Sequence, residues 1–231
     1  MKVKSVAPSH VTNYKFCPRR YRYKELDLPK IVTDTYRRDL GKDIHFAIRD
    51  YFNEISDKPS EKEIEEKAKE SFEIYKIPKR FLNKFLEFEL IRLKEWKSYK
   101  PTMVETALTL EIWKDLPPIN GVIDFYSKPD RTLIDWKTGS IDHTIDVIQG
   151  KIYELLLEKQ GFPVDRVLFV NLRTGLVQQL PRITEGFIEK EIKTFIEAVE
   201  LGYFPKRRGV WCENCEYLLR CELEGECFWG W

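Results

Sequence analysis

The stretch TLIDWKTGS, residues 132–140, has the composition of a buried strand, yet it carries an aspartate and a lysine two residues apart. Successive side chains of a strand point to opposite faces, so Asp135 and Lys137 share one face while Trp136 lies on the other. Taken alone, an Asp-x-Lys tripeptide most often marks an exposed strand end with a local ion pair of little energetic value. The neighbouring segments decide between that interpretation and a functional one.

A second aspartate lies inside the preceding apolar segment. Asp124 stands in GVIDFY, residues 121–126. Carboxylates on neighbouring strands converge, and in a poorly solvated place they raise each other's pKa unless a cation lies between them. Mg²⁺ and Mn²⁺ favour such oxygen ligands, and Lys137 on the same face would orient or deprotonate the attacking water and offset charge on a phosphate. The pattern predicts metal-assisted phosphodiester hydrolysis.

Hydrophobic periodicity and turn residues divide the chain into helices and strands. We expect helices over residues 9–23 (interrupted at Pro18), about 33–55, 60–75, about 79–99, 143–161 and 184–202. We expect strands over 102–113, 119–128, 131–140, 165–172 and 175–181, the first three antiparallel. Repeats and long linkers are absent, so the chain is predicted to be one α/β domain over 1–231.

Bulk properties bound the possible partners. The formal net charge is only +1, so a nucleic acid would have to be met by a local basic patch. No apolar run reaches the roughly 18 residues of a membrane span, and the first ten residues have no signal-peptide core. We therefore expect a soluble, cytoplasmic protein without a membrane partner. In that reducing compartment, clustered cysteines more often bind a metal than form disulfides.

Five cysteines are distributed unevenly along the chain. Four lie in WCENCEYLLRCELEGEC, residues 211–227, and Cys17 lies far upstream in YKFCPRRYRY, residues 14–23. We expect the tail to fold back to meet Cys17. Its C-x2-C spacing suits zinc as well as an iron–sulfur cluster, and the bacterial ferredoxin spacing is absent, so no redox shuttle is predicted.

Further motifs follow in a fixed order: His45 on a helix, Glu105 on a strand, Gly121-Val122-Ile123-Asp124, Asp135-Trp136-Lys137, and Gln149-x3-Tyr153 on the next helix. Together they resemble the RecB-like branch of the PD-(D/E)XK nucleases. One N-terminal cysteine followed by a C-terminal C-x2-C-x5-C is similar to the CRISPR-associated RecB-like exonucleases with an iron–sulfur cluster. A similar cysteine clasp occurs in bacterial recombination helicase–nucleases.

This resemblance implies the fold, the activity and the cofactors. The expected fold is a restriction-endonuclease-like core at about 35–200, with a mixed central sheet flanked by helices and a cysteine clasp formed by 9–24 with 205–231. The implied Mn²⁺ or Mg²⁺ ligands are His45, Asp124, Asp135 and the Trp136 carbonyl, with Lys137 catalytic and Gln149 and Tyr153 contacting DNA or supporting the metal site. The implied [4Fe–4S] ligands are Cys17, Cys212, Cys215 and Cys221, with [2Fe–2S] or structural zinc as alternatives.

Several assignments keep an alternative. Without the resemblance, His45 is a hydrogen-bonded helix residue and Tyr153 a core residue. Glu105 is either a solvent-facing strand residue or an active-site residue, as a second-metal ligand or a support of the metal site. The second signature carboxylate is Asp135 rather than the commoner Glu, and Cys227 is surplus and could substitute for Cys221.

DNA contact is expected from two basic segments that flank the predicted cluster ligands. Their candidate side chains are Arg19, Arg20, Tyr21, Arg22, Arg207 and Arg208. The position of Tyr21 among these residues is as well explained by core packing as by base stacking.

These observations predict a metal-dependent DNase, an exonuclease on single strands or DNA ends. The resemblance implies a role in CRISPR spacer acquisition alongside integrase proteins. A nuclease of recombinational repair and a catalytically inactive DNA-binding protein with a zinc clasp are the alternatives. The sequence leaves open the cleavage polarity and whether the protein forms oligomers.

Overall fold

The computed structural model describes residues 2–26, 28, 36–139, 143–209, 212–213 and 215–224. The helices are α1 (Pro8–Phe16), α2 (Pro18–Glu25), α3 (Tyr36–Glu54), α4 (Glu61–Ile74), α5 (Lys79–Glu95), α6 (His143–Lys159), α7 (Glu185–Glu200) and α8 (Leu218–Leu223). The strands are β1 (Met103–Leu110), β2 (Ile119–Ser127), β3 (Thr132–Lys137), β4 (Arg166–Asn171) and β5 (Val177–Gln179).

The described strands form one mixed sheet in the order β1-β2-β3-β4-β5. The first three are antiparallel neighbours, as the turn residues between them predict. Helix α6 then crosses over to β4, which runs parallel to β3, and β5 returns antiparallel to β4. The expected mixed central sheet of an α/β fold is therefore present.

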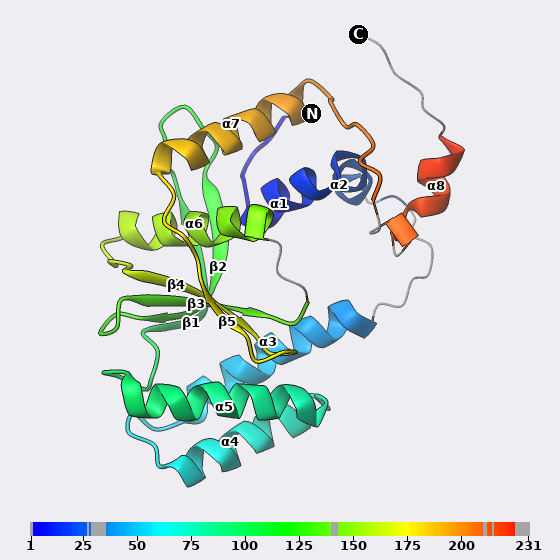
Figure 1. Ribbon diagram of the computed structural model, residues 1–231. Coiled ribbons are helices and arrows are strands. Elements are labelled where there is room, and N and C mark those ends of the chain that lie inside the picture. Colours follow the sequence, from blue (N-terminus) through cyan, green and yellow to red (C-terminus); the bar gives the residue numbers. More distant parts are fainter. Residues whose placement is uncertain are drawn as a thin grey trace.

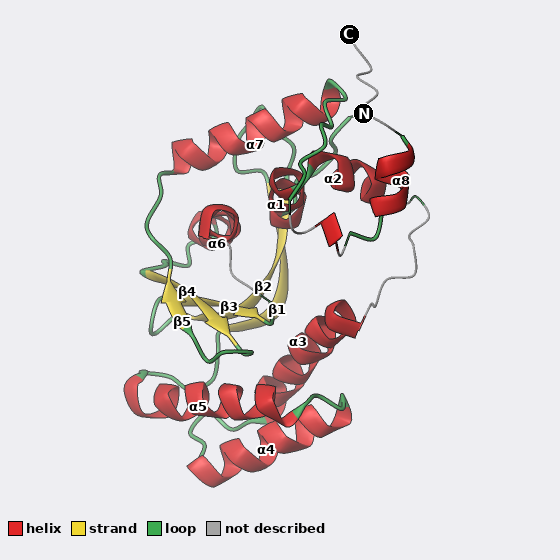
Figure 2. Ribbon diagram, turned by 45° about the vertical axis from the view of Figure 1, so that its right-hand side comes forward, coloured by secondary structure: helices red, strands yellow, loops and turns green. Residues whose placement is uncertain are grey.

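Helices cover both faces of this sheet (Figures 1 and 2). Helices α1, α6 and α7 lie on one side, and α3, α4 and α5 lie on the other. Strand β3 is consequently buried from Thr132 to Trp136, because both of its faces are covered. Asp135 thus lies inside the molecule with only 3% of its surface exposed.

The first two helices are separated at Cys17, directly before a proline. Cys17 lies between α1 and α2 in extended backbone, with φ −157° and ψ 106°. Pro18 disfavours a helical conformation at the preceding residue and is itself well suited to the first position of the next helix. The predicted interruption at Pro18 is confirmed, and it turns Cys17 out of the helical pattern.

Some boundaries differ from the expected ones. Helix α5 ends at Glu95, before the expected Tyr99, and Trp96 has extended backbone. Strand β5 is shorter than expected. The start of the helix expected from residue 33 lies outside the described residues, as does Cys227. No helix among the described residues is both long and apolar enough to cross a membrane.

Candidate active site

The register of β2 and β3 brings the two aspartates together. Phe125 pairs with Ile134, and the same register continued by one residue sets Asp124 opposite Asp135. Regular pairing stops at this point, and the Asp124 Oδ2 atom accepts a hydrogen bond of 2.9 Å from the Trp136 backbone N–H. A carboxylate thus replaces a main-chain acceptor where the strands separate.

Glu105 on β1 extends the row of carboxylates. Its neighbours Val104 and Thr106 pair with Phe125 and Ile123, so the register sets Glu105 opposite Asp124. Glu105 has φ 42°, in the left-handed region that non-glycine residues rarely occupy. Such strain persists where surrounding contacts impose it, often at functional sites. Three neighbouring strands therefore each supply one carboxylate at the same level of the sheet.

Helix α3 supplies a histidine to this row. The apolar face of α3, which includes Ile44 and Ile48, is buried in the core. This burial holds His45 at the edge of the sheet. The Nδ1 atom of His45 lies 2.8 Å from the Glu105 Oε1 atom and 3.6 Å from the Asp124 Oδ1 atom. One ligand atom from each of these three side chains lies within 4.8 Å of the others.

Lys137 occupies the other side of Asp135. Its Nζ atom lies 3.1 Å from Asp135 Oδ1, 3.6 Å from Asp146 Oδ1 and 3.0 Å from Gln149 Oε1. The ammonium group also lies over the ring of Phe169, 4.7 Å from its centroid. The second oxygen of Asp135 is buried and has no hydrogen-bond partner among the described residues.

Sequence reasoning did not single out Asp146. It precedes Gln149 by three positions and Tyr153 by seven, so the three residues share one face of α6. Extending the Gln-x3-Tyr motif backward along this face is the signal that would have identified it.

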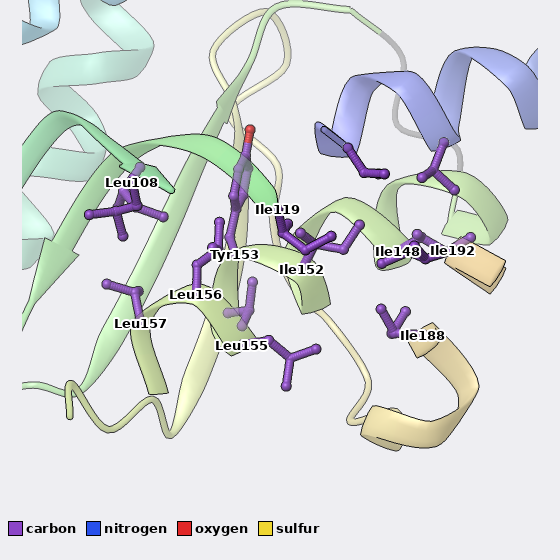
Figure 3. Close-up of a cluster of buried hydrophobic side chains, with 14 of the residues drawn as sticks. Leu108, Ile119, Ile148, Ile152, Tyr153, Leu155, Leu156, Leu157, Ile188 and Ile192 are labelled. Atoms are coloured by element: carbon purple, nitrogen blue, oxygen red, sulfur yellow. The ribbon is translucent and has the colours of Figure 1, made fainter. Parts of the chain in front are cut away.

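The pair Gln149 and Tyr153 lies beside Lys137. The amide nitrogen of Gln149 donates to the Tyr153 hydroxyl at 3.2 Å. Figure 3 shows the Tyr153 ring above the leucines of α6, with its hydroxyl oxygen directed away from them. The ring belongs to the apolar core and is 9% exposed. Tyr153 is thus a core residue whose polar end faces the candidate site.

Gly121 allows the close approach of Tyr153 to β2. A Cβ atom at this position would lie 2.8 Å from Tyr153 Cε1. Gly121→Ala is therefore expected to displace the ring, disturb its bond to Gln149 and destabilise the fold by about 1–3 kcal/mol. Urea unfolding measures this loss. Gly186→Ala, where no neighbouring atom lies within 4 Å, is the matched control. Equal unfolding midpoints for the two variants would contradict this packing role.

Burial and neighbouring charges shift the pKa values of the site. Burial lowers the pKa of His45, but the charges of Asp124 and Glu105 outweigh it and raise the pKa to about 9. Burial raises the pKa of Asp124 to about 7 against the opposing charge of His45. Burial likewise raises the pKa of Asp135. For Lys137, burial lowers the pKa, whereas Asp135 and Asp146 raise it and prevail.

The donor set fits a divalent cation. Ligand atoms of His45, Glu105 and Asp124 lie within 4.8 Å of one another, and one oxygen of the neighbouring Asp135 lacks a hydrogen-bond partner among the described residues. In the structure His45 is the cation nearest Glu105 and Asp124, whereas Asp135 contacts Lys137. Hard oxygen ligands with one imidazole suit Mn²⁺ or Mg²⁺. The structure thus places Glu105, for which the sequence left two interpretations open, beside His45 and Asp124.

Metal binding must displace protons from this group. His45 and Asp124 have pKa values raised to about 9 and about 7, and both bind a cation in their deprotonated forms. We expect Mn²⁺ affinity to rise as the pH increases from 6 to 9, with proton release on binding. Calorimetry in buffers of different ionisation enthalpy measures both quantities. An affinity independent of pH would contradict this linkage.

The four described cysteines line one pocket. Cys17 from the break between α1 and α2 faces Cys212, Cys215 and Cys221, and none of them forms a disulfide. Burial raises the pKa of the Cys215 and Cys221 thiols. The tail does fold back to the N-terminal helices, since Arg19 and Tyr23 both bond to Glu224.

The predicted DNA-contacting residues are largely engaged within the protein. Tyr21 is 3% exposed and packs edge-on against Tyr14 and Phe195, so its ring presents no face to a nucleobase. This is the core packing that the sequence left open. Two arginines bond to residues that follow α7: Arg20 binds Glu216 through two nitrogens, and Arg19 donates to the Phe204 carbonyl.

The remaining arginines differ in their surroundings. Arg22 lies over the Phe204 ring, 5.7 Å from its centroid. Arg207 donates to the Lys15 carbonyl, and Arg208 is exposed.

Comparisons with known proteins bear on this geometry. No curated protein matches the chain. Among solved structures, a chain described as "Crystal structure of SSO0001" is similar, with 15% identity and a TM-score of 0.48, over 96% of this chain and 88% of that chain. The family model of the PD-(D/E)XK nuclease superfamily matches residues 5–222, a span that includes every strand of the sheet and the whole carboxylate row. The chain therefore belongs to the PD-(D/E)XK nuclease superfamily, whose members are metal-dependent nucleases.

Proposed function

We propose that this protein is a DNA exonuclease that hydrolyses phosphodiester bonds of single strands or DNA ends. The observation that carries the proposal is the row of Glu105, Asp124 and Asp135 on neighbouring strands, with His45 on one side and Lys137 on the other. His45 and Lys137 are the cations that face this row, and the raised pKa values of Asp124 and Asp135 indicate that they offset its buried negative charge only in part. Nuclease chemistry explains why the fold retains it.

Each side chain has a proposed role. His45, Glu105, Asp124 and Asp135 would hold Mn²⁺ or Mg²⁺, with the Trp136 carbonyl as a further ligand. The metal, when bound, would activate water and offset charge on the scissile phosphate. Lys137 donates toward three acceptors, which favours its ammonium form, so it would orient the water and stabilise the developing charge. Gln149 and Tyr153 would hold Lys137 and face the DNA.

The preference for DNA ends and the setting rest on the resemblance in the motifs. Gln149-x3-Tyr153 and the cysteine pattern resemble the CRISPR-associated RecB-like exonucleases. We therefore propose a role in trimming DNA for spacer acquisition, beside integrase proteins.

Cleavage of circular and linear DNA tests the exonuclease assignment. The same single-stranded sequence is offered with Mn²⁺ as a linear strand labelled at either end and as a closed circle. An exonuclease degrades the linear strand progressively from one end and leaves the circle intact. Cleavage of the circle at a comparable rate would overturn the exonuclease proposal and leave an endonuclease.

We also propose that the four pocket cysteines bind a [4Fe–4S] cluster that clasps the chain ends around one nuclease domain. All four cysteines line one pocket, which brings Cys17 and the tail together. Four thiolates suit zinc as well, and the resemblance in the cysteine pattern is what favours the cluster.

Removing one proposed cluster ligand is expected to destabilise the clasp. Cys212→Ser should lower iron and sulfide content, bleach the visible absorption of anaerobically purified protein and lower Tm. Cys227→Ser is the matched control and should change none of these. Stoichiometric zinc in place of iron and sulfide in the wild type would contradict the cluster.

A further inference from the structure

An exposed phenylalanine lies next to the metal-site histidine. Phe46 follows His45 on α3, and 42% of its surface is exposed although neighbouring apolar residues of α3 are fully buried. The Tyr75 ring, at the end of α4, lies 6.2 Å from it at an interplanar angle of 39°. The Arg49 guanidinium lies 5.0 Å from the centroid of the Phe46 ring. We call Phe46, Arg49 and Tyr75 the aromatic–arginine patch.

Asp50 fixes the orientation of this patch. It accepts hydrogen bonds of 2.9 and 2.8 Å from the Nε and Nη2 atoms of Arg49, and one of 2.6 Å from the Tyr75 hydroxyl. Among the described residues, the Nη1 atom of Arg49 has no hydrogen-bond partner. One carboxylate therefore holds both the ring and the guanidinium in place, and leaves one nitrogen of the fork to contact a ligand.

The patch is continuous with the candidate active site. Arg49 follows His45 by four positions, so both side chains project from the same side of α3. Its hydrogen bonds to Asp50, and more weakly the charge of Glu105, raise the pKa of Arg49. A strand whose phosphate lies at the carboxylate row can therefore continue over α3 to Phe46.

The chemistry of the patch fits unpaired nucleotides. An exposed ring stacks on a base only when the base is not already stacked and paired in a duplex, and an arginine beside it meets the phosphate. The arginines expected to bind DNA near the cysteines instead bond largely to protein groups. We propose that the aromatic–arginine patch binds the single strand that enters the metal site, with one base stacked on Phe46 and a phosphate on Arg49. This inference rests on the proposed nuclease function and names where its substrate strand lies.

Binding in EDTA tests the patch without cleavage. Fluorescence anisotropy of a labelled oligothymidine and of a blunt duplex is measured for the wild type, Phe46→Ala, Phe46→Trp and Arg49→Gln. Ile91→Ala, an apolar residue on α5 that is 51% exposed, is the matched control. Because Phe46 and Ile91 are both exposed, the folded state should survive in each variant, and thermal unfolding checks this.

The stacking proposal predicts a specific pattern. Phe46→Ala should weaken oligothymidine binding about tenfold and leave duplex binding unchanged, whereas Phe46→Trp should retain the affinity. Arg49→Gln should weaken binding. It should also lower the slope of log affinity against log salt concentration by about the value of one phosphate contact. Equal affinities for Phe46→Ala, Ile91→Ala and the wild type would overturn the patch, as would equal weakening of single-strand and duplex binding by Phe46→Ala. A wild type that binds with this pattern but cleaves no DNA with Mn²⁺ would instead refute the nuclease.

Discussion

Asp124→Asn is expected to reduce Mn²⁺-dependent DNA cleavage by at least about 10²- to 10³-fold. Asp124 is the central member of the carboxylate row. The β2–β3 register sets it opposite Asp135, and the β1–β2 register sets it opposite Glu105. Asparagine keeps an oxygen to accept the Trp136 N–H but loses the negative charge that binds the cation. Cleavage rates and Mn²⁺ affinity should therefore fall together.

The same variant should not lose stability. Burial raises the pKa of Asp124 from 3.8 to about 7, so the metal-free protein loses stability from this group as the pH rises from about 4 through 7. The Tm of Asp124→Asn minus the Tm of the metal-free wild type should therefore be larger at pH 8 than at pH 5. Asp165→Asn, exposed on the surface, is the control for both readouts. A marked loss of Tm at pH 8 would show that Asp124 has a structural role instead.

Lys137→Ala is expected to lower the cleavage rate by about 10²- to 10⁴-fold with little change in metal affinity. Lys137 contacts Asp135 without belonging to the proposed ligand set, and its side chain is 17% exposed. Single-turnover cleavage at saturating Mn²⁺ measures the chemical step. Lys159→Ala, at the far end of α6 and paired with Glu185, is the control and should cleave normally. If the variant regained full activity when more Mn²⁺ was added, Lys137 would instead have a role in metal binding.

The order of elements follows from local patterns in the sequence. The β-branched and aromatic runs separated by Pro117-Pro118 and Lys128-Pro129-Asp130 predict three antiparallel strands, and these are confirmed. Once a turn fixes the register of two neighbouring strands, the sequence tells which of their side chains lie opposite each other. This is why Asp124 and Asp135 were identifiable as a pair.

Other features depend on contacts that no local pattern encodes. Glu105 enters the site through a left-handed backbone conformation, which an alternating strand does not predict. Arg92 lies on a helix expected only to be amphipathic, yet it is fully buried and forms two bonds to Glu89. The basic neighbours of Tyr21 leave base stacking and core packing equally open, whereas in the structure its ring packs between distant helices. In each case tertiary packing decides the role of the side chain.

Degradation of end-labelled single-stranded DNA tests the central claim most directly. Wild type and Asp135→Ala are compared in EDTA and after addition of Mn²⁺ or Mg²⁺, with unfolding curves to establish that both are folded. We expect the wild type to cleave only with added metal and Asp135→Ala to leave the DNA intact under every condition. Cleavage by the wild type in EDTA, or equal cleavage by the folded variant, would contradict a metal-dependent nuclease centre at this face of the sheet.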